Sequence, residues 1–225
     1  MREGAPRPVP GWLAAAGPGT TTVLLRHGET PLSGERRYAG RGDIPLTATG
    51  LEQAAAAAAR LAARGGIDLI VTSPLRRTRQ TAGAVAAATG VPLVVGDGWA
   101  ETDFGEWEGL SHTEAERAWP EQMAAWLSDT SAAPPGGESF AATSDRVLAA
   151  LDTLLAEHAG STVLVVSHVT PIKIVLLRAL LAPPAAVRRI QLDVACLSEI
   201  DWFAGDLGVV RTVNDTAHLS LPEMA

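Results

Sequence analysis

The fold of this chain is constrained most by three short apolar runs that are each followed directly by charged or hydroxyl-bearing residues. They are residues 23–25 before Arg26 and His27, residues 69–71 before Thr72, Ser73 and Arg76, and residues 163–166 before Ser167 and His168. Short runs without polar alternation are typical of strands that are buried on both faces of a parallel sheet. The carboxyl ends of parallel strands lie along one edge, where ligands bind. We therefore expect these polar side chains to meet at one ligand-binding edge.

Stretches with a helix-forming composition separate these strands. An alanine-rich segment, residues 51–64, follows the N-cap candidates Thr47 and Thr49, and residues 76–88 end before Gly90. Further elements are expected as helices at residues 111–127, 140–158 and 171–181, a short strand at 92–95, and a closing hairpin at 197–203 and 209–213. This alternation predicts an α/β fold, a three-layer αβα sandwich around a mostly parallel central sheet.

Composition limits the class of protein. The chain has 225 residues, and 47% of them are apolar, which is enough for one buried core. Residues 1–19 contain four prolines and four glycines and are expected to be a linker or tail, whereas residues 20–225 are expected to form one domain. The net charge of −7 argues against nucleic-acid or membrane binding, and no apolar run reaches the roughly 20 residues that span a bilayer. Because Cys196 is the only cysteine, we expect a cytoplasmic protein without disulfides.

Four motifs follow one another in a recognisable order. The first is the pentapeptide Arg-His-Gly-Glu-Thr at residues 26–30, and the second is Ser-Pro-Leu-Arg-Arg-Thr-Arg-Gln-Thr-Ala at residues 73–82. The third is Glu101 ahead of Phe-Gly-Glu-Trp-Glu-Gly at residues 104–109, and the fourth is Val-Ser-His at residues 166–168. In these motifs the chain resembles the histidine phosphatase superfamily, also called the phosphoglycerate mutase-like family. The resemblance implies the phosphoglycerate mutase-like version of the predicted sandwich.

The resemblance also implies roles for five residues. His27 is the nucleophile that becomes a phosphohistidine, Glu101 is the proton donor, Arg26 and Arg76 bind the phosphoryl oxygens, and a protonated His168 completes the cationic pocket. Guanidinium groups match phosphate oxygens, and such a pocket needs no metal or other cofactor for phosphoryl transfer. The attacking nitrogen of His27 has to be neutral, so its other nitrogen should donate a hydrogen bond to a nearby backbone carbonyl.

Several further residues are assigned from the same motifs. The expected phosphate- and substrate-binding set also includes Thr30 of the first motif, Ser33, where relatives often carry asparagine, Gly40 of the substrate loop, and Val169 beside His168. Arg77, Arg79, Glu106 and Glu108 are expected on the solvated surface.

Residues 167–173 resemble the α-ribazole phosphatase and broad acid phosphatase branch more than the glycolytic mutases. The leading interpretation is therefore a metal-independent phosphomonoester hydrolase that acts on a small phosphorylated metabolite, with α-ribazole phosphate as one candidate. A cofactor-dependent phosphoglycerate-type mutase and a catalytically silent phosphoester-binding module are the alternatives. The proline-rich start also resembles the linker of bacterial proteins in which a ribonuclease H domain precedes this fold. The oligomeric state, monomer or dimer, stays open.

Overall fold

Strand β1 (Thr20–Arg26) lies inside a six-stranded sheet with the strand order β3-β2-β4-β1-β5-β6. The computed structural model describes residues 19–219, so the linker or tail expected at residues 1–19 lies outside the described residues except for Gly19. Three further strands run parallel to β1, namely β2 (Leu69–Thr72), β3 (Leu93–Val95) and β4 (Thr162–Ser167). The last two, β5 (Leu197–Phe203) and β6 (Leu207–Asp215), form an antiparallel hairpin beside β1. The predicted mostly parallel sheet is confirmed.

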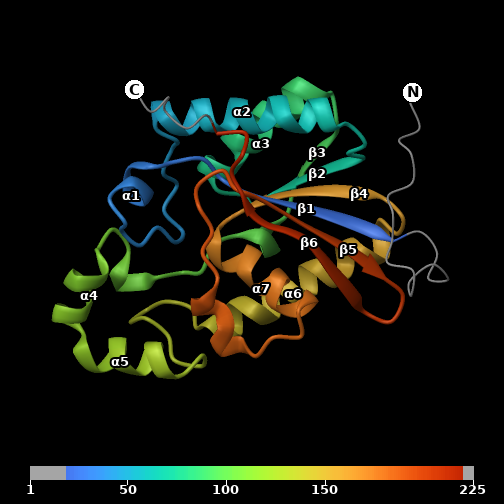
Figure 1. The fold of residues 1–225 in the computed structure, drawn as a ribbon. Coiled ribbons are helices and arrows are strands. Elements are labelled where there is room, and N and C mark those ends of the chain that lie inside the picture. Colours follow the sequence, from blue (N-terminus) through green and yellow to red (C-terminus); the bar gives the residue numbers. More distant parts are fainter. Residues whose placement is uncertain (1–18, 220–225) are drawn as a thin grey trace.

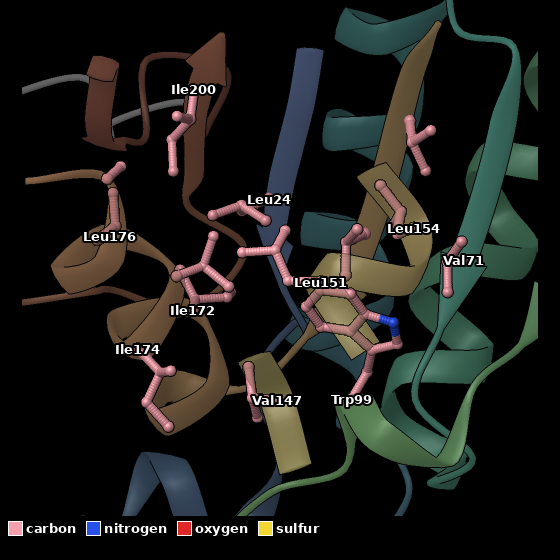
Figure 2. Close-up of a cluster of buried hydrophobic side chains, with 14 of the residues drawn as sticks. Leu24, Val71, Trp99, Val147, Leu151, Leu154, Ile172, Ile174, Leu176 and Ile200 are labelled. Atoms are coloured by element: carbon pink, nitrogen blue, oxygen red, sulfur yellow. The ribbon is translucent and has the colours of Figure 1, made fainter. Parts of the chain in front are cut away.

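Helices cover both faces of this sheet (Figure 1). On one face lie α2 (Ala48–Arg64) and α3 (Arg76–Thr89), and on the other lie α6 (Phe140–Glu157) and α7 (Val169–Ala179). Side chains alternate along β1, so that Leu24 joins the core under α6 and α7 (Figure 2), whereas Val23 and Leu25 pack under α2 and α3. The predicted three-layer αβα sandwich is therefore confirmed.

Close backbone packing fixes the start of α2 against the end of β1. A side chain at Gly28 would place its Cβ 2.3 Å from the carbonyl oxygen of Gly50, and one at Gly50 would place its Cβ 2.1 Å from that of Glu29. Only glycine at both positions permits this approach. The Thr47 hydroxyl caps the helix by accepting a hydrogen bond from the Gly50 amide. The segment that carries His27 is thereby fixed in place.

Two short helices, α4 (His112–Ala118) and α5 (Pro120–Ser128), replace the single helix that was predicted at residues 111–127. The break falls at Trp119, whose φ of −136° and ψ of 65° are not helical. Proline disfavours the helical conformation of the residue before it, and Pro120 therefore ends α4 and starts α5. No helix within residues 19–219 is both long and apolar enough to cross a membrane.

Candidate active site

His27 lies immediately after β1 and is buried. Its Nδ1 is 2.7 Å from the carbonyl oxygen of Gly28, and because a carbonyl only accepts, Nδ1 carries the proton and donates. Burial, together with the positive charges of Arg77 and Arg26, holds the pKa of His27 well below its usual value. His27 is therefore neutral with the lone pair on Nε2, the state that a nucleophile requires, and the predicted backbone partner is confirmed.

Arg26, the last residue of β1, supplies an unfilled donor beside this histidine. One of its terminal nitrogens donates to the carbonyl of Leu192 at 2.6 Å. Its Nε is buried and finds no hydrogen-bond partner among the described residues. Buried donors are nearly always paired, so an unpaired guanidinium nitrogen at the rim of a cavity indicates a place for an anion.

The arginine that turns inward from α3 is Arg77, not Arg76. Arg76 is exposed, and within residues 19–219 its backbone amide, not its guanidinium, forms a hydrogen bond, donating to Asp43. Arg77 is fully buried, and its Nε donates to Nδ1 of His168 at 3.2 Å. The expectation that Arg77 is a surface residue is wrong, and Arg76 is not brought into the site. Successive helix residues differ in direction by about 100°, so a shift of one position exchanges the inward and outward faces.

The guanidinium of Arg77 is held by a loop. Its terminal nitrogens donate to the carbonyl oxygens of Ala39, Gly40 and Gly42 at 2.8–3.1 Å. With the bond from Nε to His168, four of its five N–H groups are used. The N–H that remains is on the terminal nitrogen that donates to Gly42.

His168 is fully buried behind His27, with the two ring centroids 5.1 Å apart. Because its Nδ1 accepts from Arg77, its Nε2 carries the proton and donates to the hydroxyl of Ser73 at 2.7 Å. Burial and the charge of Arg77 hold the pKa of His168 well below its usual value, with His27 adding a further lowering. The expected protonated His168 is therefore wrong, and Arg77 carries the positive charge instead.

Glu101 is buried and lines the same cavity as His27. Its two carboxylate oxygens accept from the amides of Thr102 at 2.9 Å and of Thr170 at 3.4 Å. Arg146 of α6 fixes the segment, because its guanidinium donates to the backbone carbonyls of Gly98, Ala100 and Glu101. Sequence reasoning missed Arg146, which has no motif around it.

Two of the expected binding residues, Thr30 and Gly40, serve the loops around the cavity rather than its wall. The Thr30 hydroxyl caps the short helix α1 (Pro31–Gly34) by accepting from the Ser33 amide. The Gly40 amide donates to Glu108 at 2.7 Å, while its carbonyl accepts from Arg77. Glu108 was expected on the solvated surface, but one of its carboxylate oxygens is buried without a partner among residues 19–219 and the other holds this loop.

A cavity of about 850 Å³ opens at this edge of the sheet. Of the sequence-predicted residues, it is lined by Arg26, His27, Ser33, Glu101 and Val169. The cavity also has an aromatic wall, formed by Tyr38, Phe104 and Trp126. Four further cations line it, namely Arg36, Arg37, Lys173 and Arg188. Within residues 19–219, no group of three or more histidine, cysteine, aspartate or glutamate side chains is arranged to hold a metal ion.

The fold and the site together define a class of protein, an α/β enzyme with a histidine and a guanidinium donor at the carboxyl edge of its sheet. The chain belongs to the histidine phosphatase superfamily (branch 1), whose model matches residues 22–216. It is therefore an enzyme of the phosphatase or mutase type.

Three similar proteins bear on the function. The chain is 49% identical over 93% of its length to "Bifunctional protein Rv2228c" of Mycobacterium tuberculosis, but it spans only 58% of the length of that relative. It is 39% identical to "Probable phosphoglycerate mutase GpmB" of Yersinia enterocolitica, with 89% of this chain and 95% of that protein covered. The crystal structure of the α-ribazole phosphatase from Shigella flexneri is similar with a TM-score of 0.77 and 30% identity, over 87% of this chain and 96% of that one.

Proposed function

We propose that this chain is a metal-independent phosphomonoester hydrolase of the acid phosphatase type that works through a phosphohistidine at His27. The observation that carries the proposal is the commitment of His27 Nδ1 to the Gly28 carbonyl, which leaves a neutral Nε2 beside the unfilled Nε of Arg26. A neutral imidazole nitrogen next to a vacant guanidinium donor suits attack on a bound phosphoryl group.

In the first step, the lone pair of His27 Nε2 forms a bond to phosphorus while the bond from phosphorus to the ester oxygen breaks. Glu101 gives its proton to that oxygen, so the alcohol leaves neutral. Nε of Arg26 and the last free N–H of Arg77 bind the equatorial phosphoryl oxygens, where negative charge is concentrated. His168 supports the guanidinium of Arg77 and the ring of His27 from behind.

In the second step, the Glu101 carboxylate takes a proton from water, and the resulting hydroxide attacks phosphorus. The bond between phosphorus and nitrogen breaks, the electron pair returns to His27 Nε2, and inorganic phosphate leaves. Glu101 is then protonated again and ready for the next ester. Each group ends the cycle in the state in which it began.

A mutase is the second candidate function, because one relative carries that name and the cavity holds four cations besides Arg26. Within hydrolysis, α-ribazole 5′-phosphate is a candidate substrate, since a similar structure is an α-ribazole phosphatase and the wall of Tyr38, Phe104 and Trp126 could stack on a planar base. Phosphate release from a panel of α-ribazole 5′-phosphate, phosphoglycerates, sugar phosphates and nucleotides distinguishes these outcomes. A mutase would isomerise phosphoglycerates with little net phosphate release, and a silent binding module would turn over none of the panel.

The mechanism itself is tested by rapid acid-free quenching during turnover of a ³²P-labelled ester. We expect label on the wild-type protein that is lost in acid and kept in base, no label on His27→Ala, and unchanged turnover after dialysis against EDTA. Normal turnover by His27→Ala, or loss of turnover in EDTA, would refute the mechanism.

The partner and location remain proposals as well. The name of the bifunctional mycobacterial relative and the 58% coverage of its length support an upstream ribonuclease H domain. The substrate would be a small cytoplasmic phosphorylated metabolite. The mass of the native protein in a cytosolic extract, detected with an antibody to this domain, tests both proposals.

A further inference from the structure

Lys173 is the only lysine of the chain, and it faces the active-site cavity from α7. Its side chain is partly buried, and among residues 19–219 its ammonium forms no hydrogen bond or ion pair, although the charge of Glu101 acts on it. Charged groups that are withdrawn from water are normally paired. An unpaired ammonium inside a substrate cavity therefore needs an explanation from the ligand.

The position of Lys173 on α7 relates it to the reacting atoms. Thr170, which also lines the cavity, donates its amide to Glu101, the residue proposed to protonate the leaving oxygen. Lys173 follows three residues later on the same helix face, about 4.5 Å farther along the axis. It therefore lies on the cavity wall about one helix turn from the residue that holds the acid.

The other cations of the cavity do not already account for a second charge on the substrate. Arg26 is beside His27 and is assigned to the phosphoryl group in the proposed mechanism. Arg37 is paired with Glu35 and Glu114, and Arg188 stacks on Trp126. Arg36 is exposed, so water solvates its charge without a ligand. Glu101 is the anion whose charge acts on Lys173, and in the proposed mechanism it holds a proton until the alcohol leaves. One phosphoryl group would therefore leave the ammonium without an anionic partner in that state.

We propose that Lys173 binds an anionic group, a carboxylate or a second phosphate, on the leaving alcohol within a few atoms of the ester oxygen. This inference rests on the proposed function and makes Lys173 a specificity-determining residue. An uncharged leaving alcohol such as α-ribazole has no group for this ammonium, so the inference ranks it below an anionic one.

The test compares kcat/KM for ester pairs that differ only in the second charge. One pair is 3-phosphoglycerate and glycerol 3-phosphate, which differ by a carboxylate, and the other is glucose 1,6-bisphosphate and glucose 6-phosphate. Each pair is measured with the wild type, Lys173→Met, Lys173→Arg and a control, Arg79→Met, which removes an exposed cation of α3 that does not line the cavity. A charge-assisted contact predicts that the wild type prefers the anionic member of at least one pair by about tenfold or more.

Lys173→Met should lose that preference, while Lys173→Arg and Arg79→Met should keep most of it. The pair that responds identifies the anionic group as a carboxylate or a phosphate. Equal kcat/KM within both wild-type pairs, an unchanged ratio in Lys173→Met, or faster turnover of α-ribazole 5′-phosphate than of either anionic ester would overturn the inference while leaving phosphatase activity in place. No phosphate release from any ester would overturn the proposed function and this inference with it.

Discussion

Replacing Arg77 by methionine should impair both stability and turnover, because this side chain connects a loop to His168, which packs against the proposed nucleophile His27. The change removes four hydrogen bonds, of which the two to Gly40 and His168 are buried. Carbonyls near solvent can bind water instead, so only these two acceptors lose a donor outright, at about 1–3 kcal/mol each. We therefore expect a loss of about 2–6 kcal/mol in the free energy of unfolding. The urea midpoint, with an unchanged slope, measures this loss.

The same substitution has two effects on the chemistry. Loss of a preorganised donor to the phosphoryl oxygens should lower kcat about 10²–10³-fold. Arg77 also helps to hold the pKa of His27 below its usual value, so its removal raises that pKa. Because His27 attacks in its neutral form, the acid limb of the pH profile of kcat/KM should then move to higher pH. Hydrolysis of p-nitrophenyl phosphate between pH 4 and 9 measures both effects.

Arg76→Met is the matched control, since it removes an exposed arginine one position earlier. We expect its unfolding free energy to stay within about 0.5 kcal/mol of wild type and its kcat to stay near wild type. If Arg76→Met were the more damaging variant in either assay, the placement of the two arginines described above would be wrong.

Two further predictions concern the acid and the glycine contact. Glu101→Gln should slow hydrolysis of alkyl phosphates about 10²–10⁴-fold but that of p-nitrophenyl phosphate much less, because a phenolate leaves without a proton; equal losses on both ester types would remove Glu101 from the acid role. Gly28→Ala should lower the free energy of unfolding, measured by urea denaturation, by about 1–3 kcal/mol, since the added Cβ would lie 2.3 Å from the Gly50 oxygen. Its control, Gly83→Ala on the exposed side of α3, meets nothing within 4 Å and should stabilise the helix by about 0.5–1 kcal/mol; a Gly28→Ala variant as stable as this control would contradict the packing argument.

The sheet was predictable because its strands are unusually apolar. Residues 163–166 have no polar alternation, which fits β4, where all four are fully buried. The break at Trp119 was also readable in principle, because Pro120 is in the sequence, but the polar residues on both sides gave a continuous helical pattern.

The choice between Arg76 and Arg77 was not settled by the motif alone. Two adjacent arginines at a helix start differ only in helix phase, and the phase depends on where the first turn begins. A signal did exist, because Arg77, Thr81 and Val85 recur at intervals of four, and all three are buried. The protonation state of His168 was beyond sequence reasoning, since it depends on a hydrogen bond from Arg77 across 91 residues.

Charge in this site is carried by groups that cannot lose it. Arginine stays protonated in proteins, whereas two buried histidines beside it cannot both be cations at acceptable cost. Arg26 and Arg77 thus supply permanent positive charge, and they help to keep His27 neutral, as the proposed nucleophile has to be. The guanidinium of Arg77 is held in place by the backbone carbonyls and the His168 nitrogen that accept its hydrogen bonds.

These acceptors connect the histidines of the site to the loop that carries Gly40. Glu108 holds the Gly40 amide, the carbonyl of Gly40 accepts from Arg77, and Arg77 donates to His168. Tyr38, two residues before Gly40, belongs to the aromatic wall of the cavity. In the proposed mechanism, a leaving group that shifts this loop would also shift the acceptors of Arg77, so the fit of the alcohol would affect the transition state through hydrogen bonds rather than through direct contact with phosphorus.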